Sequence, residues 1–118
     1  MALTVQTQIS GDVFILDCNG RITSGDECAV LRERVVNMLP GTPNIVVNLE
    51  GVDHIDSDGL GMLVGLLVSA RNRSGELKLA SPRKRVTDLL RRTHLDTIFR
   101  VYASNEEAVA AFSKRRAA

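Results

Sequence analysis

The chain has 118 residues, of which 44% are hydrophobic, 25% are charged and 3% are aromatic. This length fits one domain with its own core, and the composition is that of an ordinary soluble globular protein. Scarce aromatic side chains and a net charge of +1 argue against a nucleic-acid-binding protein, which needs stacking platforms or a strongly basic surface.

No segment predicts export or membrane insertion. The opening MALTVQTQIS lacks the basic and apolar regions of a signal peptide, and the longest apolar run, LGMLVGLLV, is far shorter than the roughly 20 residues that span a bilayer. Cys18 and Cys28 fit neither a disulfide framework nor a zinc motif, so we expect buried, reduced thiols. These features predict a cytoplasmic protein without a metal ion or another cofactor.

The charges are divided unevenly between the two halves of the chain. Residues 1–59 hold three arginines and nine acidic residues, a net charge of −6. Residues 60–118 hold twelve basic and five acidic residues, a net charge of +7. Such asymmetry indicates an acidic interaction surface or a basic tail, and it does not choose between them.

The N-terminal part of the chain predicts a hairpin. Residues 3–8 alternate between polar and apolar, and a short glycine turn separates them from a second apolar run over 13–20. Phe14, Leu16 and Cys18 share one face of that second strand. Two adjacent strands joined by a short turn favour antiparallel pairing.

A helix and a central strand follow. Ser24 is the predicted N-cap of a helix that runs to about Leu39, with Glu27 as its capping-box partner. Residues 44–52 are nearly all apolar, which is typical of a strand covered on both faces.

The second half of the chain continues the alternation of helices and strands. In order, the patterns predict a helix that ends near Asn72, a strand over 74–80, a helix over 81–93, a strand over 97–103 and a helix over 104–118. Ser81 is the expected cap of the helix over 81–93, with Pro82 in its first position.

The predicted order is β-β-α-β-α-β-α-β-α. Strands that alternate with helices indicate a mainly parallel sheet with right-handed crossovers. We therefore predict a single α/β domain over residues 1–118, with about five strands, four helices and an antiparallel strand at the N-terminus.

The segment HIDSDGLGML, residues 54–63, stands where the third strand ends and a helix begins. Functional groups of open α/β sheets gather at this edge, and helix N-termini favour anions. Its serine and aspartates are also good helix caps. Gly59, Gly61 and Gly65 each disfavour a helix, so three of them within seven residues indicate close approach by the sheet or by another protein.

A catalytic interpretation of this segment is weaker. Asp56-Ser57-Asp58-Gly59 matches the DxDG nucleophile loop of haloacid-dehalogenase-type phosphatases, in which two carboxylates hold Mg²⁺ and attack phosphate. That family needs a further acidic pair at later strand ends, and these strand ends supply none. We therefore predict that the protein is not an enzyme.

A family resemblance appears in two stretches. VVNLEGVDHIDSDGLGMLVGLLVSARNRSGELKLASPRKRVTDLLRRTHLDTIFRVYASNEEAVAAF resembles the STAS domain of bacterial anti-sigma-factor antagonists, and the earlier VFILDCNGRIT resembles the strand and turn of that family. The most specific motif is D-S-x-G-L-G after a V-N-L-x-x-V strand. Together the two stretches cover nearly the whole chain.

The resemblance implies regulation of transcription by partner switching. Antagonists of this family bind an anti-sigma factor that is also a Ser/Thr kinase of the GHKL type, and thereby free the sigma factor. The kinase phosphorylates a serine at the start of the second helix and so breaks the complex, and a PP2C-type phosphatase reverses the reaction. The added phosphate carries nearly two negative charges into a packed interface.

At the phosphorylated position this chain departs from the family. The usual D-S-S-G is D-S-D-G here, so Asp58 replaces the acceptor serine, and Ser57 matches a neighbour that is usually not the acceptor. Three hypotheses follow: Asp58 imitates phosphoserine permanently with about one charge, Ser57 has become the acceptor, or phosphorylation plays no part. We favour a constitutively charged or unswitched form.

The resemblance also implies a partner-binding surface around this motif. It comprises Gly20, Arg21, Thr23, Ser24, Asp56, Ser57, Asp58, Gly59, Leu60, Gly61 and Met62. Two alternative functions stay open: a STAS module of another assembly, such as a stress-signalling complex or a lipid-transport apparatus, and a small-ligand or nucleotide-binding domain. The sequence leaves the oligomeric state and the identity of the sigma factor undetermined.

Overall fold

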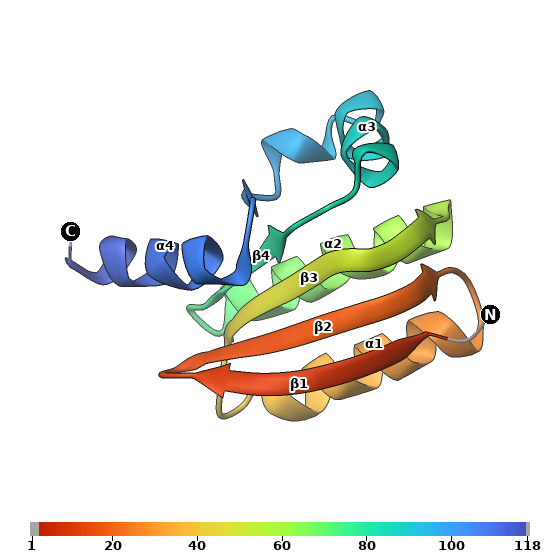
Figure 1. Cartoon of the computed structure of the whole chain (residues 1–118). Coiled ribbons are helices and arrows are strands. Elements are labelled where there is room, and N and C mark those ends of the chain that lie inside the picture. The colour runs from red at the N-terminus through yellow and green to blue at the C-terminus, as the bar shows by residue number, and fades with distance from the viewer. Residues whose placement is uncertain (1–2, 118) are drawn as a thin grey trace.

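The computed structural model describes residues 3–117, apart from the side chains of Asp26, Glu27 and residues 114–117. Its elements in chain order are β1 (Thr4–Ser10), β2 (Val13–Ile22), α1 (Asp26–Met38), β3 (Asn44–Ile55), α2 (Ser57–Asn72), β4 (Glu76–Ala80), α3 (Lys84–Arg92), the 3₁₀ turn η1 (Leu95–Thr97), β5 (Val101–Tyr102) and α4 (Asn105–Ala117) (Figure 1). The predicted order of strands and helices is confirmed, with η1 as an addition.

The five strands form one sheet in the order β1-β2-β3-β4-β5. β1 and β2 are antiparallel, and every other neighbouring pair is parallel. Gly11 makes the hairpin turn with a φ of 62°, a left-handed conformation that glycine adopts without steric cost. The predicted α/β class, with one antiparallel strand at the N-terminus, is therefore confirmed.

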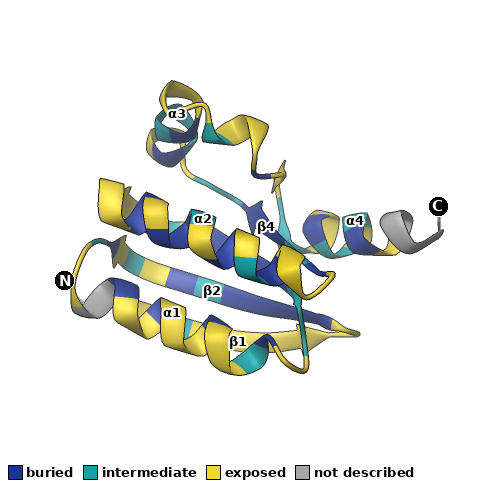
Figure 2. Cartoon of the chain, turned by 180° about the vertical axis from the view of Figure 1, so that it is seen from behind, coloured by how far each residue is buried: buried dark blue, intermediate teal, exposed yellow. Residues whose placement is uncertain are grey.

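Helices cover both faces of the sheet. α1, α2 and α3 pack on one face around the larger core, to which α2 contributes Leu63 and Leu67 and α3 contributes Val86 and Leu90. α4 covers part of the other face through a smaller core that includes Phe112. The buried stripes of α1 and α2 face the sheet while their outer sides are exposed (Figure 2).

Strand β2 shows how the pattern follows from this layering. Phe14, Leu16 and Cys18 belong to the core under α1 and α2, as predicted. Val13 and Ile15 point to the opposite side and belong to the core under α4. Because both sides of the strand are covered, apolar residues occupy successive positions rather than alternate ones.

Both predicted serine caps are wrong. Helix α1 begins after Gly25, which has a φ of 92° and makes no side-chain capping bond, and the side chain of Glu27 lies outside the described part. Helix α3 begins after Arg83. Ser81 is held instead by β5, because its N–H donates to the Tyr102 carbonyl (2.8 Å) and its Oγ donates to the Ala103 carbonyl (2.9 Å).

The strand predicted over 97–103 is much shorter than expected. The 3₁₀ turn η1 takes up the beginning of that range, and only Val101–Tyr102 pair with β4. Phe99, just before β5, is buried in the larger core. Of the apolar residues in this range, Phe99 is buried while Ile98 and Val101 are each 39% exposed, so the apolar pattern over 97–103 overstated the length of the strand.

Candidate partner-binding surface at the start of helix α2

The surface implied by the family resemblance lies at the carboxyl edge of the parallel strands. β2 and β3 end side by side there, with Ile22 opposite Ile55, and α2 begins two residues after β3 ends (Figure 1). The structure therefore brings the segments 20–24 and 56–62 together, although about thirty residues separate them in the sequence.

Asp56 joins these two segments. It is the N-cap of α2, and its Oδ1 accepts a hydrogen bond from the N–H of Gly59 (2.8 Å). Its Oδ2 accepts a hydrogen bond from the N–H of Ser24 (3.0 Å), and its own N–H donates to the carbonyl of Ile22 (3.3 Å). These three bonds form the Asp56 clamp, which fixes the start of α2 to the loop after β2.

The clamp changes the acid strength of Asp56. The N–H of Gly59, and after it the N–H of Ser24, stabilise the carboxylate form and lower the pKa of this carboxyl group below its ordinary value. Both carboxylate oxygens hold backbone groups, so the role of Asp56 in this structure is to position the loop. No three His, Cys, Asp or Glu side chains among the described residues are arranged to hold a metal ion.

Gly59 allows the close approach that the clamp requires. It is buried, and a Cβ atom at this position would collide with the carbonyl oxygen of Ile22. A Cβ atom on Gly61 or Gly65 would meet nothing within 4 Å. Close approach within the chain therefore explains only Gly59, and the other two glycines face open space.

The exposed side of α2 carries Asp58, Gly61, Gly65 and Val68, which we call the α2 stripe. These residues are spaced three or four apart and so lie on one side of the helix. Val68 is 50% exposed, and Asp58 is exposed in the first turn. The stripe thus presents a carboxylate, two positions without side chains and one apolar group.

The remaining residues of the implied surface differ in exposure. Ser57, Arg21 and Ser24 are exposed, whereas Gly20 and Thr23 are half-buried. Leu60 and Met62 are buried in the larger core, with 8% and 6% exposure. From their spacing in the sequence, it was not possible to say whether Leu60 and Met62 lie in the core or on the surface. In the structure both side chains point into the core.

The comparisons with known proteins agree with this architecture. Residues 4–108 match the family model described as STAS domain. The chain belongs to the STAS domain family. No helix in the described part of the chain is long and apolar enough to cross a membrane.

Several individual proteins of known name are similar to this chain. The anti-sigma-B factor antagonist of Bacillus subtilis is 28% identical over 105 residues, which cover 89% of this chain and 87% of that protein. An anti-sigma factor antagonist homologue from Thermotoga neapolitana is 38% identical over 69 residues, which cover 58% of this chain and 61% of that relative. The crystal structure of an anti-sigma factor antagonist from Thermotoga maritima superposes with a TM-score of 0.84 at 29% identity, over 91% of this chain and 92% of that one.

Proposed function

We propose that this STAS protein is an anti-sigma-factor antagonist that binds its anti-sigma factor through the start of α2. The name of the B. subtilis relative, which matches over 89% of this chain, supports this function. The T. maritima antagonist, with its TM-score of 0.84, supports it as well. The partner is an anti-sigma factor of the GHKL kinase type.

The observation that carries this proposal is the exposure of Asp58 in the first turn of α2. The Asp56 clamp and the buried Gly59 hold the first turn of α2 against the end of β2. Asp58 and Ser57 are exposed on that turn, so a partner can reach both side chains without any rearrangement of the fold. A charge at this point changes the interface directly.

In this proposal Asp58 holds the surface permanently in a charged state. A carboxylate supplies about one negative charge, whereas phosphoserine supplies nearly two. The protein then binds a standard anti-sigma kinase weakly, or it is matched to a partner with a basic contact at this position. A PP2C-type phosphatase has no substrate at Asp58.

The rest of the α2 stripe suits a close protein contact. Gly61 and Gly65 leave the backbone of the helix accessible, and Val68 adds an apolar group farther along. A partner helix or loop that lies on these glycines approaches more closely than a longer side chain would allow. We include Gly61 and Gly65 in the proposed binding surface for this reason.

Affinity capture followed by titration tests the function. Immobilised wild-type protein and Asp58→Ser are exposed to an extract of the source bacterium, and captured proteins are identified by mass spectrometry. We expect a sigma-factor-binding GHKL protein, and purified partner is then titrated by calorimetry. Removal of the charge in Asp58→Ser should tighten binding about tenfold, the effect of about 1.4 kcal/mol.

Asp96→Ser is the matched control, because it removes an exposed carboxylate from η1, outside both the Asp56 clamp and the implied binding surface. Its affinity should equal that of the wild type. Equal affinities for wild type and Asp58→Ser would contradict the role of the Asp58 charge. Phosphate mapped to Ser57 after incubation with the partner and ATP would show instead that the switch has moved by one residue.

A further inference from the structure

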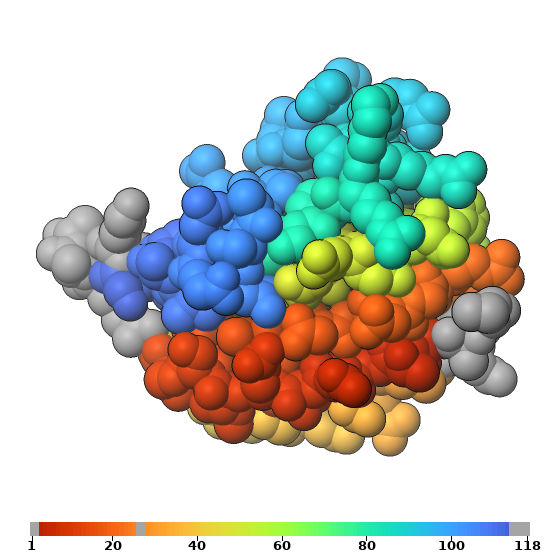
Figure 3. Space-filling view, in the orientation of Figure 1, coloured from red at the N-terminus to blue at the C-terminus, as the bar shows by residue number. Residues whose placement is uncertain are grey.

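Strand β1 is one border of the sheet. All seven residues, Thr4–Ser10, pair with β2 in one continuous register without a bulge. On its outer side such a strand presents backbone N–H and C=O groups at alternate residues. The opposite border, β5, is only two residues long. Figure 3 shows β1 in red, on the surface along one side of the molecule.

Strand β1 lacks three of the features that usually protect an edge strand, namely charged residues, prolines and bulges within the strand itself. Proteins block such edges with charged side chains, prolines or bulges, and TVQTQIS contains neither a charged residue nor a proline. Ile9 is 64% exposed. The carbonyl of Val5 accepts a bond of 3.4 Å from Arg34 Nη1 of α1. A bond of that length is readily exchanged for a strand–strand bond.

We propose that β1 pairs antiparallel with β1 of a second copy of this chain, around a two-fold axis at Thr7. The strand reads alike in both directions around that residue. In this register Thr7 faces Thr7 of the partner subunit, Gln6 faces Gln8 of the partner subunit, Val5 faces Ile9 of the partner subunit and Thr4 faces Ser10 of the partner subunit. Every pair then joins residues of like chemistry, which is what an interface of two identical surfaces requires.

The faces of the sheet support this register. Val5, Thr7 and Ile9 are opposite Cys18, Leu16 and Phe14 of β2, so they lie on the side of α1. Gln6 and Gln8 lie on the other side. Shifting the axis to either glutamine shortens the pairing and sets Val5 or Ile9 against threonine. The axis at Thr7 pairs all seven residues and matches the two apolar side chains.

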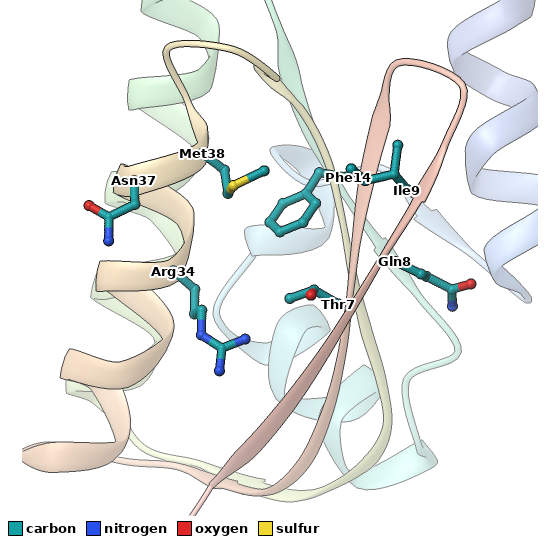
Figure 4. A pocket seen from close by; sticks show the side chains of 7 residues that line it. All are labelled: Thr7, Gln8, Ile9, Phe14, Arg34, Asn37 and Met38. Carbon is teal, nitrogen blue, oxygen red and sulfur yellow. The ribbon is translucent and has the colours of Figure 1, made fainter.

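A groove beside β1 lies next to Ile9 of this apolar pair (Figure 4). Its volume is about 490 Å³, and it lies between the hairpin and the second half of α1. Its lining includes Thr7, Ile9, Phe14, Arg34 and Met38. Val5 of the partner subunit would lie opposite Ile9 at this groove. Val30, which is 40% exposed one turn before Arg34, extends the apolar surface along the same side of α1.

The mass in solution tests the proposal. Sedimentation equilibrium at about 100 µM, which populates a dimer of micromolar Kd, should give twice the mass of one chain for the wild type. Thr7→Lys places two ammonium groups opposite each other on the axis and should give the mass of one chain. Thr4→Lys puts the same substitution opposite Ser10 of the partner subunit and should leave the dimer in place. A monomeric wild type, or a dimeric Thr7→Lys, would overturn the proposal.

A cross-link tests the register itself. Thr7→Cys should form a disulfide between two copies under mild oxidation, because facing residues of paired strands lie within the Cα separation that a disulfide spans. Thr4→Cys is the matched control, since its two copies lie at opposite ends of the paired strands. The native Cys18 and Cys28 are buried and do not compete. Equal cross-linking at both positions would contradict the two-fold pairing.

Discussion

Asp56 joins two parts of the chain that are 32 residues apart, through its bond to the N–H of Ser24. Its second oxygen caps α2 through Gly59. An aspartate at this point was predictable as a helix cap, because capping depends on the local sequence alone. The bond to Ser24 depends on the pairing of β2 with β3, and local patterns carry no information on it. The residue therefore has one local role and one tertiary role.

Because the pKa of Asp56 is lowered, the thermal stability of the protein should depend on the charge of this residue at neutral pH. A carboxyl group whose pKa is lowered in the folded state stabilises the fold at pH values above its ordinary pKa, which is 3.8 for Asp56. This stabilisation is lost as the pH falls through the lowered pKa of the folded state. Asp56→Asn should therefore lower Tm at pH 7, since one amide oxygen replaces two charged acceptors. The difference in Tm between wild type and variant should shrink as the pH falls to about 2.5.

Thermal unfolding followed by circular dichroism measures this difference. Asp53→Asn removes a carboxylate from the exposed side of β3 and should change Tm little at either pH. A Tm difference for Asp56→Asn that stays constant down to the acid limit would mean that the charge on Asp56 does not stabilise the fold.

Helix α2 combines two kinds of glycine within three residues. Gly59 packs against the backbone of β2, and Gly61 stands on the exposed side of the helix. Sequence patterns treat both as helix-disfavouring positions and indicate close approach for each. The structure separates them, because only the path of β2 determines which side of the helix is occupied.

Alanine at these two positions should therefore have opposite effects. Gly59→Ala forces a Cβ atom against the Ile22 carbonyl and should destabilise the fold by about 1–3 kcal/mol. Gly61→Ala should stabilise it by up to about 1 kcal/mol, because alanine favours the helix and its Cβ meets nothing. Urea unfolding measures both changes. Destabilisation by Gly61→Ala would contradict the open space at that position.

The variant Gly61→Ala should also distinguish an effect on stability from an effect on partner binding. In the proposed function Gly61→Ala obstructs the α2 stripe, so it should weaken binding of the anti-sigma factor while it stabilises the fold. Calorimetry with the captured partner measures the affinity. A variant that is more stable and binds equally well would remove Gly61 from the binding surface.

At the scale of the whole molecule, the sheet separates two cores, and both cysteines lie in the larger one. Cys18 faces α1 from β2, and Cys28 packs from α1 itself. Burial, and secondarily the neighbouring Asp17 carboxylate, raise the pKa of the Cys18 thiol to about 12. The reactive thiolate is therefore scarce at neutral pH, and reagents reach it only when the fold opens.

Thiol labelling should thus report global unfolding. In native buffer between about pH 7 and 9, both cysteines should react with a disulfide reagent at the rate of unfolding rather than at the rate of an exposed thiol. Labelling should become fast in urea above the unfolding midpoint. Fast labelling of Cys18 in the native protein would show that β2 opens locally without global unfolding.

Much of the fold was predictable from local patterns. The apolar runs over 13–20 and 44–52 identified β2 and β3 because burial on both faces leaves a continuous pattern. Ser24 and Ser81 were wrongly predicted as caps, since a serine before an apolar run is a cap only if the helix begins directly after it. Ser81 is held by β5, which joins the sheet more than twenty residues later.

The order of the elements, the family and the aspartate at the position of the usual phosphoserine could all be read from the amino-acid sequence, because periodicity and motifs are local properties. Contacts in the folded chain were needed to learn that Asp56 bonds to the loop after β2 and that Gly61 faces open space while Gly59 does not. They also make β1 a border strand of the sheet, which the sequence did not specify. These outcomes depend on which segments meet across the sheet, and chain neighbours alone do not specify such contacts.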